Sequence, residues 1–332
     1  MPASVRRRTI IERCRYTGER HSQAAPAVRG SDHGLDRCTP SQQRFRANLA
    51  LLLLNSGAQV VDADPYLDAL IPGRPFLADW GVGRLLSYTM TLSAWRDELV
   101  IVSEMHDHLM APMRPRADRR GPNGIPGLRP LDRHPDDHWF RWKHLPTGAI
   151  LRFQGVGPIL QWGKGPEGEY LWSTALRTTQ LDETEALAAN CVPRMHHDAE
   201  TLLAALVVRL TSADPDGQWA VHSLVWSRYK KYASTGSTGI HLWGKDTDWT
   251  LSWGGQCCVP TEHLGHALAG SPIGLSGATF DTASDGVTTV RYGAARLVLI
   301  AHTDHYARAE TERRDARLRS KLSRGKRSSR NR

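Results

Sequence analysis

The chain has 332 residues, is 40% hydrophobic and carries a net charge of +9. This length and apolar content are enough for one large domain or two smaller ones with cores of their own. The longest apolar run near the N-terminus, residues 49–54, is too short to cross a bilayer. The five cysteines are an odd number without a CxxC pair, which argues against a disulfide framework. We therefore expect a soluble, cytoplasmic protein.

The positive charge is concentrated at the two ends of the chain. Residues 1–50 hold ten arginines against four acidic residues, and residues 303–332 hold eleven basic residues against four acidic ones. The ends therefore carry +6 and +7, which leaves −4 for residues 51–302. A basic chain indicates a polyanionic partner such as nucleic acid, and this distribution assigns that contact to the ends.

The chain is expected to begin with an unstructured arm that leads into a helix. Residues 1–38 are rich in Arg, Ser, Gly and Pro without apolar periodicity, which predicts a disordered basic arm. Thr39 and Pro40 are typical of a helix start, and the Leu-rich run that follows predicts a helix that ends at residues 55–57.

Residues 39–112 are predicted to form a small αβ segment around this helix. A strand over residues 58–61, a helix within 77–95 and a strand over 99–103 suggest a βαβ-like unit. Residues 113–137 are dense in Arg, Pro and Gly, which predicts a long exposed loop or linker and marks the best candidate for a domain boundary.

Residues 138–302 complete a chain of the α+β class. We expect a mainly antiparallel, Trp-rich sheet with helices packed on it. Strands are predicted over residues 138–142, 149–154, 159–162, 169–173, 218–226, 279–282, 288–292 and 296–301. Helices are predicted over residues 182–189, 198–210 and 261–269, with Asp198 as the N-cap of the second.

A Trp-bearing hairpin occurs twice in this region. The sequence Trp-Gly-Lys stands at residues 162–164 and again at 243–245, 81 residues later, and a predicted helix follows each copy. Two explanations stay open. One is an internal duplication of a hairpin-plus-helix unit, with halves 138–215 and 218–302, and the other is coincidence in a chain with 11 Trp.

The C-terminal end is predicted to lie outside the core. Acidic residues precede basic ones by four positions in residues 303–319, which favours a solvated helix. Residues 320–332 predict a disordered basic tail.

Two cysteines and two histidines are the candidate catalytic residues. Cys257 and Cys258 precede a predicted helix, whose N-terminus lowers a thiol pKa, and His302 and His305 follow the last predicted strand. This order is loosely similar to papain-like and NlpC-type hydrolases, and the resemblance implies a Cys nucleophile with a His base. The alternative is that both cysteines fill the core as small apolar side chains.

Histidines at strand ends are candidate metal ligands, namely His106, His108, His302 and His305. Residues 302–305 resemble the latter part of the HxHxDH motif of metallo-β-lactamase-fold hydrolases, but Ile300 stands where its first histidine belongs. Solvated strand-end histidines are the alternative. The sequence holds no phosphate-binding loop and no zinc-type CxxC pattern, so no cofactor is predicted.

Two basic stretches are candidate nucleic-acid contacts. Arg228, Lys230 and Lys231 are interleaved with aromatic residues that can stack on bases, although such a pattern is more often an exposed strand with solvated cations. Lys326 and Arg327 lie in the basic tail.

Together these patterns favour a non-enzymatic bacterial interaction or accessory protein. Its basic tails would contact nucleic acid or an acidic protein partner, and no membrane contact is expected. A bacterial origin is expected because the composition is typical of GC-rich genomes. Two alternatives stay open. They are a hydrolase that uses Cys257 or Cys258 with His302, or a His-based metal site, and a structural component of a secretion or phage-like assembly.

Overall fold

The computed structural model describes eleven stretches of the chain, which together contain the core. They are residues 4–54, 90–103, 113, 116–118, 121–123, 125–134, 139–155, 179–190, 192–221, 240–254 and 259–302.

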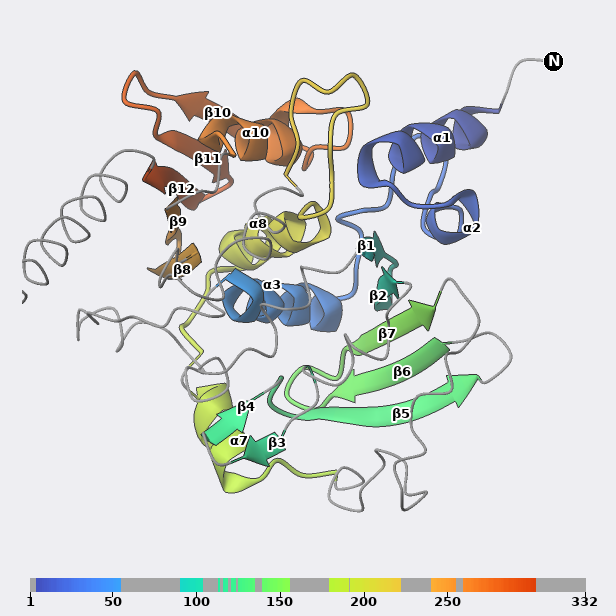
Figure 1. Ribbon diagram of the computed structural model, residues 1–332, viewed down its shortest axis with the longest axis vertical. Coiled ribbons are helices and arrows are strands. Elements are labelled where there is room, and N and C mark those ends of the chain that lie inside the picture. Colours follow the sequence, from blue (N-terminus) through green and yellow to red (C-terminus); the bar gives the residue numbers. More distant parts are fainter. Residues whose placement is uncertain are drawn as a thin grey trace, which may run out of the picture.

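Two five-stranded mixed sheets lie on either side of a pair of helices (Figure 1). The pair consists of α3 (Pro40–Leu54) and α8 (His197–Val208). Both helices are buried nearly all round because each is covered by its partner and by strands. Most strand pairs are antiparallel, so the predicted α+β class is confirmed.

The first sheet has the order β1-β2-β7-β6-β5, and the second has the order β10-β11-β12-β9-β8. The strands of the first are β1 (Met90–Ala94), β2 (Glu98–Ser103), β5 (Leu128–His134), β6 (Trp139–His144) and β7 (Ile150–Gly155). Those of the second are β8 (Ile240–Lys245), β9 (Asp248–Gly254), β10 (Thr279–Thr282), β11 (Thr288–Tyr292) and β12 (Ala295–His302). The remaining elements are α7 (Glu183–Asn190), α10 (Thr261–Gly265) with its π-helical continuation (His266–Gly270), and the short pair β3 (Arg116–Asp118) and β4 (Gly121–Asn123).

The two sheets share one topology. In each, a helix leads into an antiparallel hairpin, β1–β2 or β8–β9, and a three-stranded antiparallel meander follows. The last meander strand then pairs in parallel with the second hairpin strand, as β7 with β2 and β12 with β9. The fold therefore contains an internal repeat, but its units run from α3 to β7 and from α8 to β12, with the helix before the hairpin, and not over the predicted halves 138–215 and 218–302. The predicted first hairpin copy, residues 159–173, lies outside the described residues.

Hydrogen bonds at the helix starts repeat as well. The backbone N–H of Thr39, before α3, donates to the carbonyl of Arg96 in the β1–β2 turn at 3.0 Å. The N–H of His196, 157 residues later and before α8, donates to the carbonyl of Asp246 in the β8–β9 turn at 3.0 Å. Each helix start is thus fixed to the hairpin turn of its own half.

The same relation holds between the two helices. Gln43 Nε2 donates to Thr201 Oγ1 at 2.9 Å, and Arg44 Nε donates to Glu200 Oε1 at 3.2 Å. Gln43 and Glu200 are 157 residues apart, and so are Arg44 and Thr201. Each pair therefore occupies the positions of the other pair with the two halves exchanged. The halves are therefore related by a pseudo-twofold axis that passes through the helix pair.

The prediction that residues 1–38 are disordered is wrong. They form α1 (Val5–Thr17) and α2 (His21–Ala24), which pack beside β1 (Figure 1). Ser4 caps α1, and Gly18 ends it with a left-handed backbone (φ 75°). The buried side chains of α1 are mostly polar, so the helix leaves little hydrophobic periodicity in the sequence.

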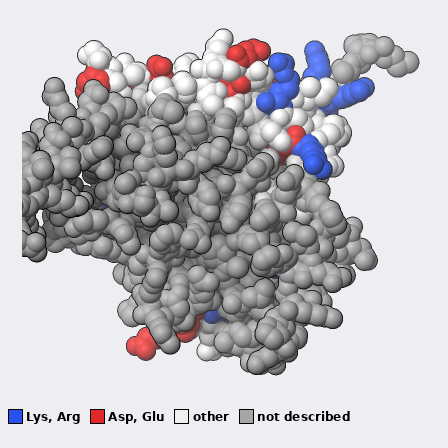
Figure 2. All heavy atoms as spheres, in the orientation of Figure 1, with Lys and Arg blue, Asp and Glu red and all other residues white. Residues whose placement is uncertain are grey.

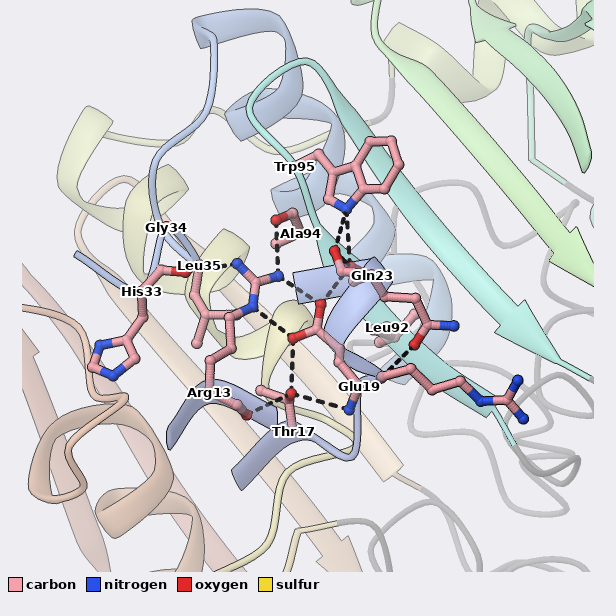
Figure 3. A network of polar contacts seen from close by, with 12 residues as sticks. Arg13, Thr17, Glu19, Gln23, His33, Gly34, Leu35, Leu92, Ala94 and Trp95 are labelled. Atoms are coloured by element: carbon pink, nitrogen blue, oxygen red, sulfur yellow. Dashed lines mark hydrogen bonds and ion pairs between the residues drawn. The ribbon is translucent and has the colours of Figure 1, made fainter. Parts of the chain in front are cut away.

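A buried ion pair fixes this N-terminal unit to the first sheet (Figure 3). Arg13 donates from Nε and Nη2 to the two carboxylate oxygens of Glu19, each at 2.6 Å, and both side chains are fully buried. Arg13 also donates to the backbone carbonyl of Ala94 at the end of β1, at 3.0 Å. The hydroxyls of Thr17 and Ser93 donate to the same carboxylate. The pair is therefore fully hydrogen-bonded, as a buried charge requires.

Several predicted elements differ from the structure. Residues 90–94 of the predicted helix 77–95 are strand β1, which forms a hairpin with β2 and not a βαβ unit. Residues 128–134 of the predicted linker are β5, an edge strand of the first sheet. The predicted strand 218–226 is not seen over residues 218–221. The predicted strand over 58–61 and the predicted elements beyond residue 302 lie outside the described residues.

The N-cap of α8 is also corrected. The side chain of His196, not that of Asp198, accepts the hydrogen bond from the first turn, through Nδ1 at 3.2 Å. Asp198 accepts instead from the backbone N–H of Ala294, in the β11–β12 turn, at 2.8 Å. Among the helices that the structure describes, none combines the length and hydropathy needed to span a bilayer.

Replacing Glu19 by Gln should strongly destabilise the N-terminal unit. The substitution keeps the shape of the side chain but leaves the charge of Arg13 buried without a counter-ion, a change that costs about 3–5 kcal/mol. Urea unfolding measures the loss of stability, and limited trypsin digestion reports whether α1 unfolds so that the backbone is cleaved after its arginines.

The matched control is Asp281→Asn, which removes an ion pair with Arg291 whose side chains are 62% and 53% exposed. Exposed pairs contribute about 1 kcal/mol or less. If Glu19→Gln cost no more than this control, the buried pair would not be what holds the unit in place.

Candidate functional site

The N-terminal unit carries a group of exposed arginines, here called the N-terminal basic surface. Its members are Arg7, Arg8, Arg15, Arg20 and Arg29, all of them exposed. Figure 2 shows Lys and Arg side chains gathered over the corner that α1 and α2 occupy in Figure 1.

Helical spacing places Arg8 and Arg15 on the outer side of α1. Ile10, Arg13 and Thr17 are buried against the rest of the unit. Arg8 and Arg15 lie two turns apart on the opposite side, with the 46% exposed Ile11 between them. Because α1 is fixed by the Arg13–Glu19 pair, this stripe belongs to the folded body.

Most of these guanidinium groups are free to bind an anion. Within the described part of the chain, the side chains of Arg7, Arg8, Arg20 and Arg29 have no acidic partner. Arg15 has Asp216 at 4.0 Å, and both side chains are more than half exposed, so this contact is weak.

Other arginines are buried and have structural roles. Arg209 donates to both carboxylate oxygens of Asp36 at 2.6 Å and to the carbonyl of Ile273. Arg46 is buried in α3 and donates to the carbonyls of Trp95 and Glu98, and burial lowers its pKa. These guanidinium groups join separate segments and cannot reach a ligand.

The two described cysteines have thiols of low reactivity. Burial raises the thiol pKa of both Cys14 and Cys38, which is the opposite of what activates a nucleophile. Among the residues that the structure describes, no group of three His, Cys, Asp or Glu side chains is arranged to hold a metal ion.

Nearly all the predicted site residues lie outside the described residues. These are Cys257, Cys258, His106, His108, His305, Arg228, Lys230, Lys231, Lys326 and Arg327. His302 is described as the last residue of β12, where it pairs with Gly254 of the parallel strand β9. Gly254 precedes Cys257 by three residues in the sequence, so β12 and β9 end side by side at His302 and Gly254. The catalytic and metal-ligand roles stay predictions.

Comparison with models of protein families gave no match for this chain, and comparisons with curated proteins and with solved structures gave none either.

The N-terminal basic surface was missed as a folded site, although its arginines were visible in the sequence. Two signals could have revealed the helix beneath it, namely Ser4 as an N-cap and Gly18 as the helix stop. The interior of α1 lacked the apolar stripe that would have indicated a helix, because two of its inward positions are Arg13 and Thr17.

One buried histidine has a strongly shifted pKa. His144 ends β6 beneath Phe45, and its Nδ1 lies 2.8 Å from Thr147 Oγ1. Burial lowers its pKa from 6.5 to about 4, outweighing a hydrogen bond with the backbone of Pro126 that acts in the opposite direction. The ring is therefore neutral in the folded protein at pH 7 and supplies no charge.

His144 should make the protein less stable in acid. Because its pKa is lower folded than unfolded, the unfolded state binds the proton first, and stability falls as the pH drops from about 6.5 towards 4. Between pH 7 and pH 5 we expect this residue to remove about 2 kcal/mol from the free energy of unfolding. Urea unfolding at both pH values should show the loss in the wild type and a smaller one in His144→Gln. Equal losses in the two proteins would contradict the assignment.

Proposed function

We propose that the protein is a non-enzymatic, cytoplasmic binding protein that contacts nucleic acid through its basic ends. The observation that carries this proposal is the N-terminal basic surface, whose guanidinium groups are exposed, mostly unpaired and held on a folded unit. The basic residues of the C-terminal end add to the same charge.

The geometry of α1 supports a contact with phosphates. Arg8 and Arg15 are seven residues apart, which corresponds to about 10 Å along a helix. Nucleic acid carries closely spaced charges along its backbone, so several arginines on a rigid helix can each meet a phosphate without reading the base sequence. Binding of this kind is weak, independent of sequence and steeply dependent on salt.

A membrane surface is a less suitable partner for the same arginines. An interfacial helix needs a continuous apolar face to enter the lipid. On α1 the exposed large apolar side chains are Val5 and Ile11, while Ile10 is buried within the protein.

Binding of a short fluorescent DNA duplex across a salt series tests the proposal. In the triple variant Arg7→Gln, Arg8→Gln, Arg15→Gln, the slope of log affinity against log salt should decrease by about three, since each lost phosphate contact removes about one. A double variant, Lys326→Gln and Arg327→Gln, measures the share of the C-terminal end in the same assay.

A charge-matched control separates contact from overall charge. Arg194→Gln, Arg291→Gln and Arg296→Gln also remove three positive charges, but from a linker and the second sheet. This variant should keep most of the wild-type slope. The proposal is wrong if both triple variants behave alike, if the wild type does not bind the duplex, or if it binds anionic vesicles and not DNA.

A further inference from the structure

A cavity of about 410 Å³ lies beside the C-terminal half of α3. One wall is a single face of α3, formed by Arg44, Asn48, Leu51 and Leu52. The other walls come from Pro126 before β5, from the end of β6 and the turn that follows it, from the end of α7, and from the linker and first turn of α8. The volume is in the range of small-molecule sites.

The pseudo-twofold axis shows that this space is specific to one half. The shift of 157 residues that relates Thr39 to His196 also relates Leu52 to Arg209, and Asp36 to Pro193. In the second half, the buried Arg209 and the partly buried Asp36 form an ion pair at this position. In the first half, Leu52 and Pro193 stand there and line the cavity.

The walls are held by backbone contacts, so the cavity exists before any ligand binds. The linker wall is fixed where Met195 forms a bridge with Asp246, whose N–H donates to the carbonyl of Arg194 at 2.9 Å. At the β6–β7 turn, Gly127 approaches so closely that a Cβ would lie 2.7 Å from Leu181 and from Pro146. Preformed walls reduce the cost of ordering on binding.

The polar groups define the ligand. Arg44 donates to Glu200 through Nε, and its side chain is 63% exposed; within the described residues its terminal nitrogens have no acceptor. The Asn48 carboxamide makes no hydrogen bond to any residue that the structure describes. Arg194 and Glu200 also belong to the lining, and the exposed Arg194 lies 3.8 Å from Asp246 through Nε, so Arg44 is the main positive group for a ligand. His144 is neutral, as described above, and much of the remaining lining is apolar.

We infer that this cavity binds a small organic anion, with the apolar body between Leu51, Leu52 and Val192 and the carboxylate at Arg44 and Asn48. Apolar lining with a few convergent polar groups is the usual composition of such sites. A carboxylate at Arg44 gains a charge-assisted hydrogen bond, which an uncharged analogue of the same shape lacks.

Naphthalene-1-acetate and its neutral amide are the matched probes. Their binding to the full chain is measured by isothermal titration calorimetry and by ligand-observed NMR. We expect the acetate to bind at least about tenfold more tightly than the amide, the factor that one hydrogen bond to a charged group supplies. In Arg44→Gln, a change at an exposed side chain, the affinity for the acetate should fall to that for the amide.

A second variant copies the other half of the molecule. The double variant Leu52→Arg, Pro193→Asp introduces an Arg–Asp pair at the positions equivalent to Arg209 and Asp36. This pair should fill the cavity and abolish binding of both probes. Arg291→Gln, which also removes an arginine with an acidic partner, should change neither affinity. The inference is overturned if the wild type binds neither probe, if the preference for the anion survives in Arg44→Gln, or if the folded double variant still binds.

Discussion

The contact between α3 and α8 is the constraint on which the rest of the fold depends. Each helix is covered on nearly all sides, because one sheet lies on each side of the pair. The start of a helix must still satisfy its backbone N–H groups. The chain meets this need in the same way in both halves, with the residue before the helix bonded to the neighbouring hairpin turn. Helix and hairpin are thereby fixed together, and the meander strands complete a unit that occurs twice.

Arginine serves two opposite purposes in this protein. Arg13, Arg46 and Arg209 are buried, and they bridge carboxylates and carbonyl groups from distant segments. Such a group costs desolvation, but its planar donor fork can satisfy several acceptors at once, which favours one arrangement of the segments. Arg7 and Arg8 lie on the same helix as Arg13 but face solvent. The excess charge of the sequence therefore overstates what is available for binding, and the fold decides which arginines can act.

The sequence indicated the elements whose side chains follow a simple period. The hairpin β8–β9 was predictable because apolar residues alternate on both sides of a short turn, and α8 because its run of Leu, Ala and Val is long enough for a helix. The helix α1 was not predictable by this criterion, because Arg13 and Thr17 occupy buried positions.

The boundaries of the duplication were hidden for a similar reason. Trp95, bonded to Glu98 across the β1–β2 turn, corresponds to Lys245, paired with Asp248 across the β8–β9 turn, so these equivalent positions do not share a residue type. The basic run at residues 6–8 was visible in the sequence, but the helix α1 that carries it was not.

The cavity could not be predicted from sequence at all, because its walls come from segments far apart in the chain. It arises where the two halves differ. Two copies of one fold, packed about a pseudo-twofold axis, create two equivalent spaces beside the helix pair. An ion pair fills one of them, and apolar side chains leave the other open. Filling the first space ties the N-terminal unit to the second half, since Asp36 follows α2 and Arg209 follows α8. The duplicated fold thus uses one equivalent position for stability and leaves the other available to a ligand, without changing the strand order of either half.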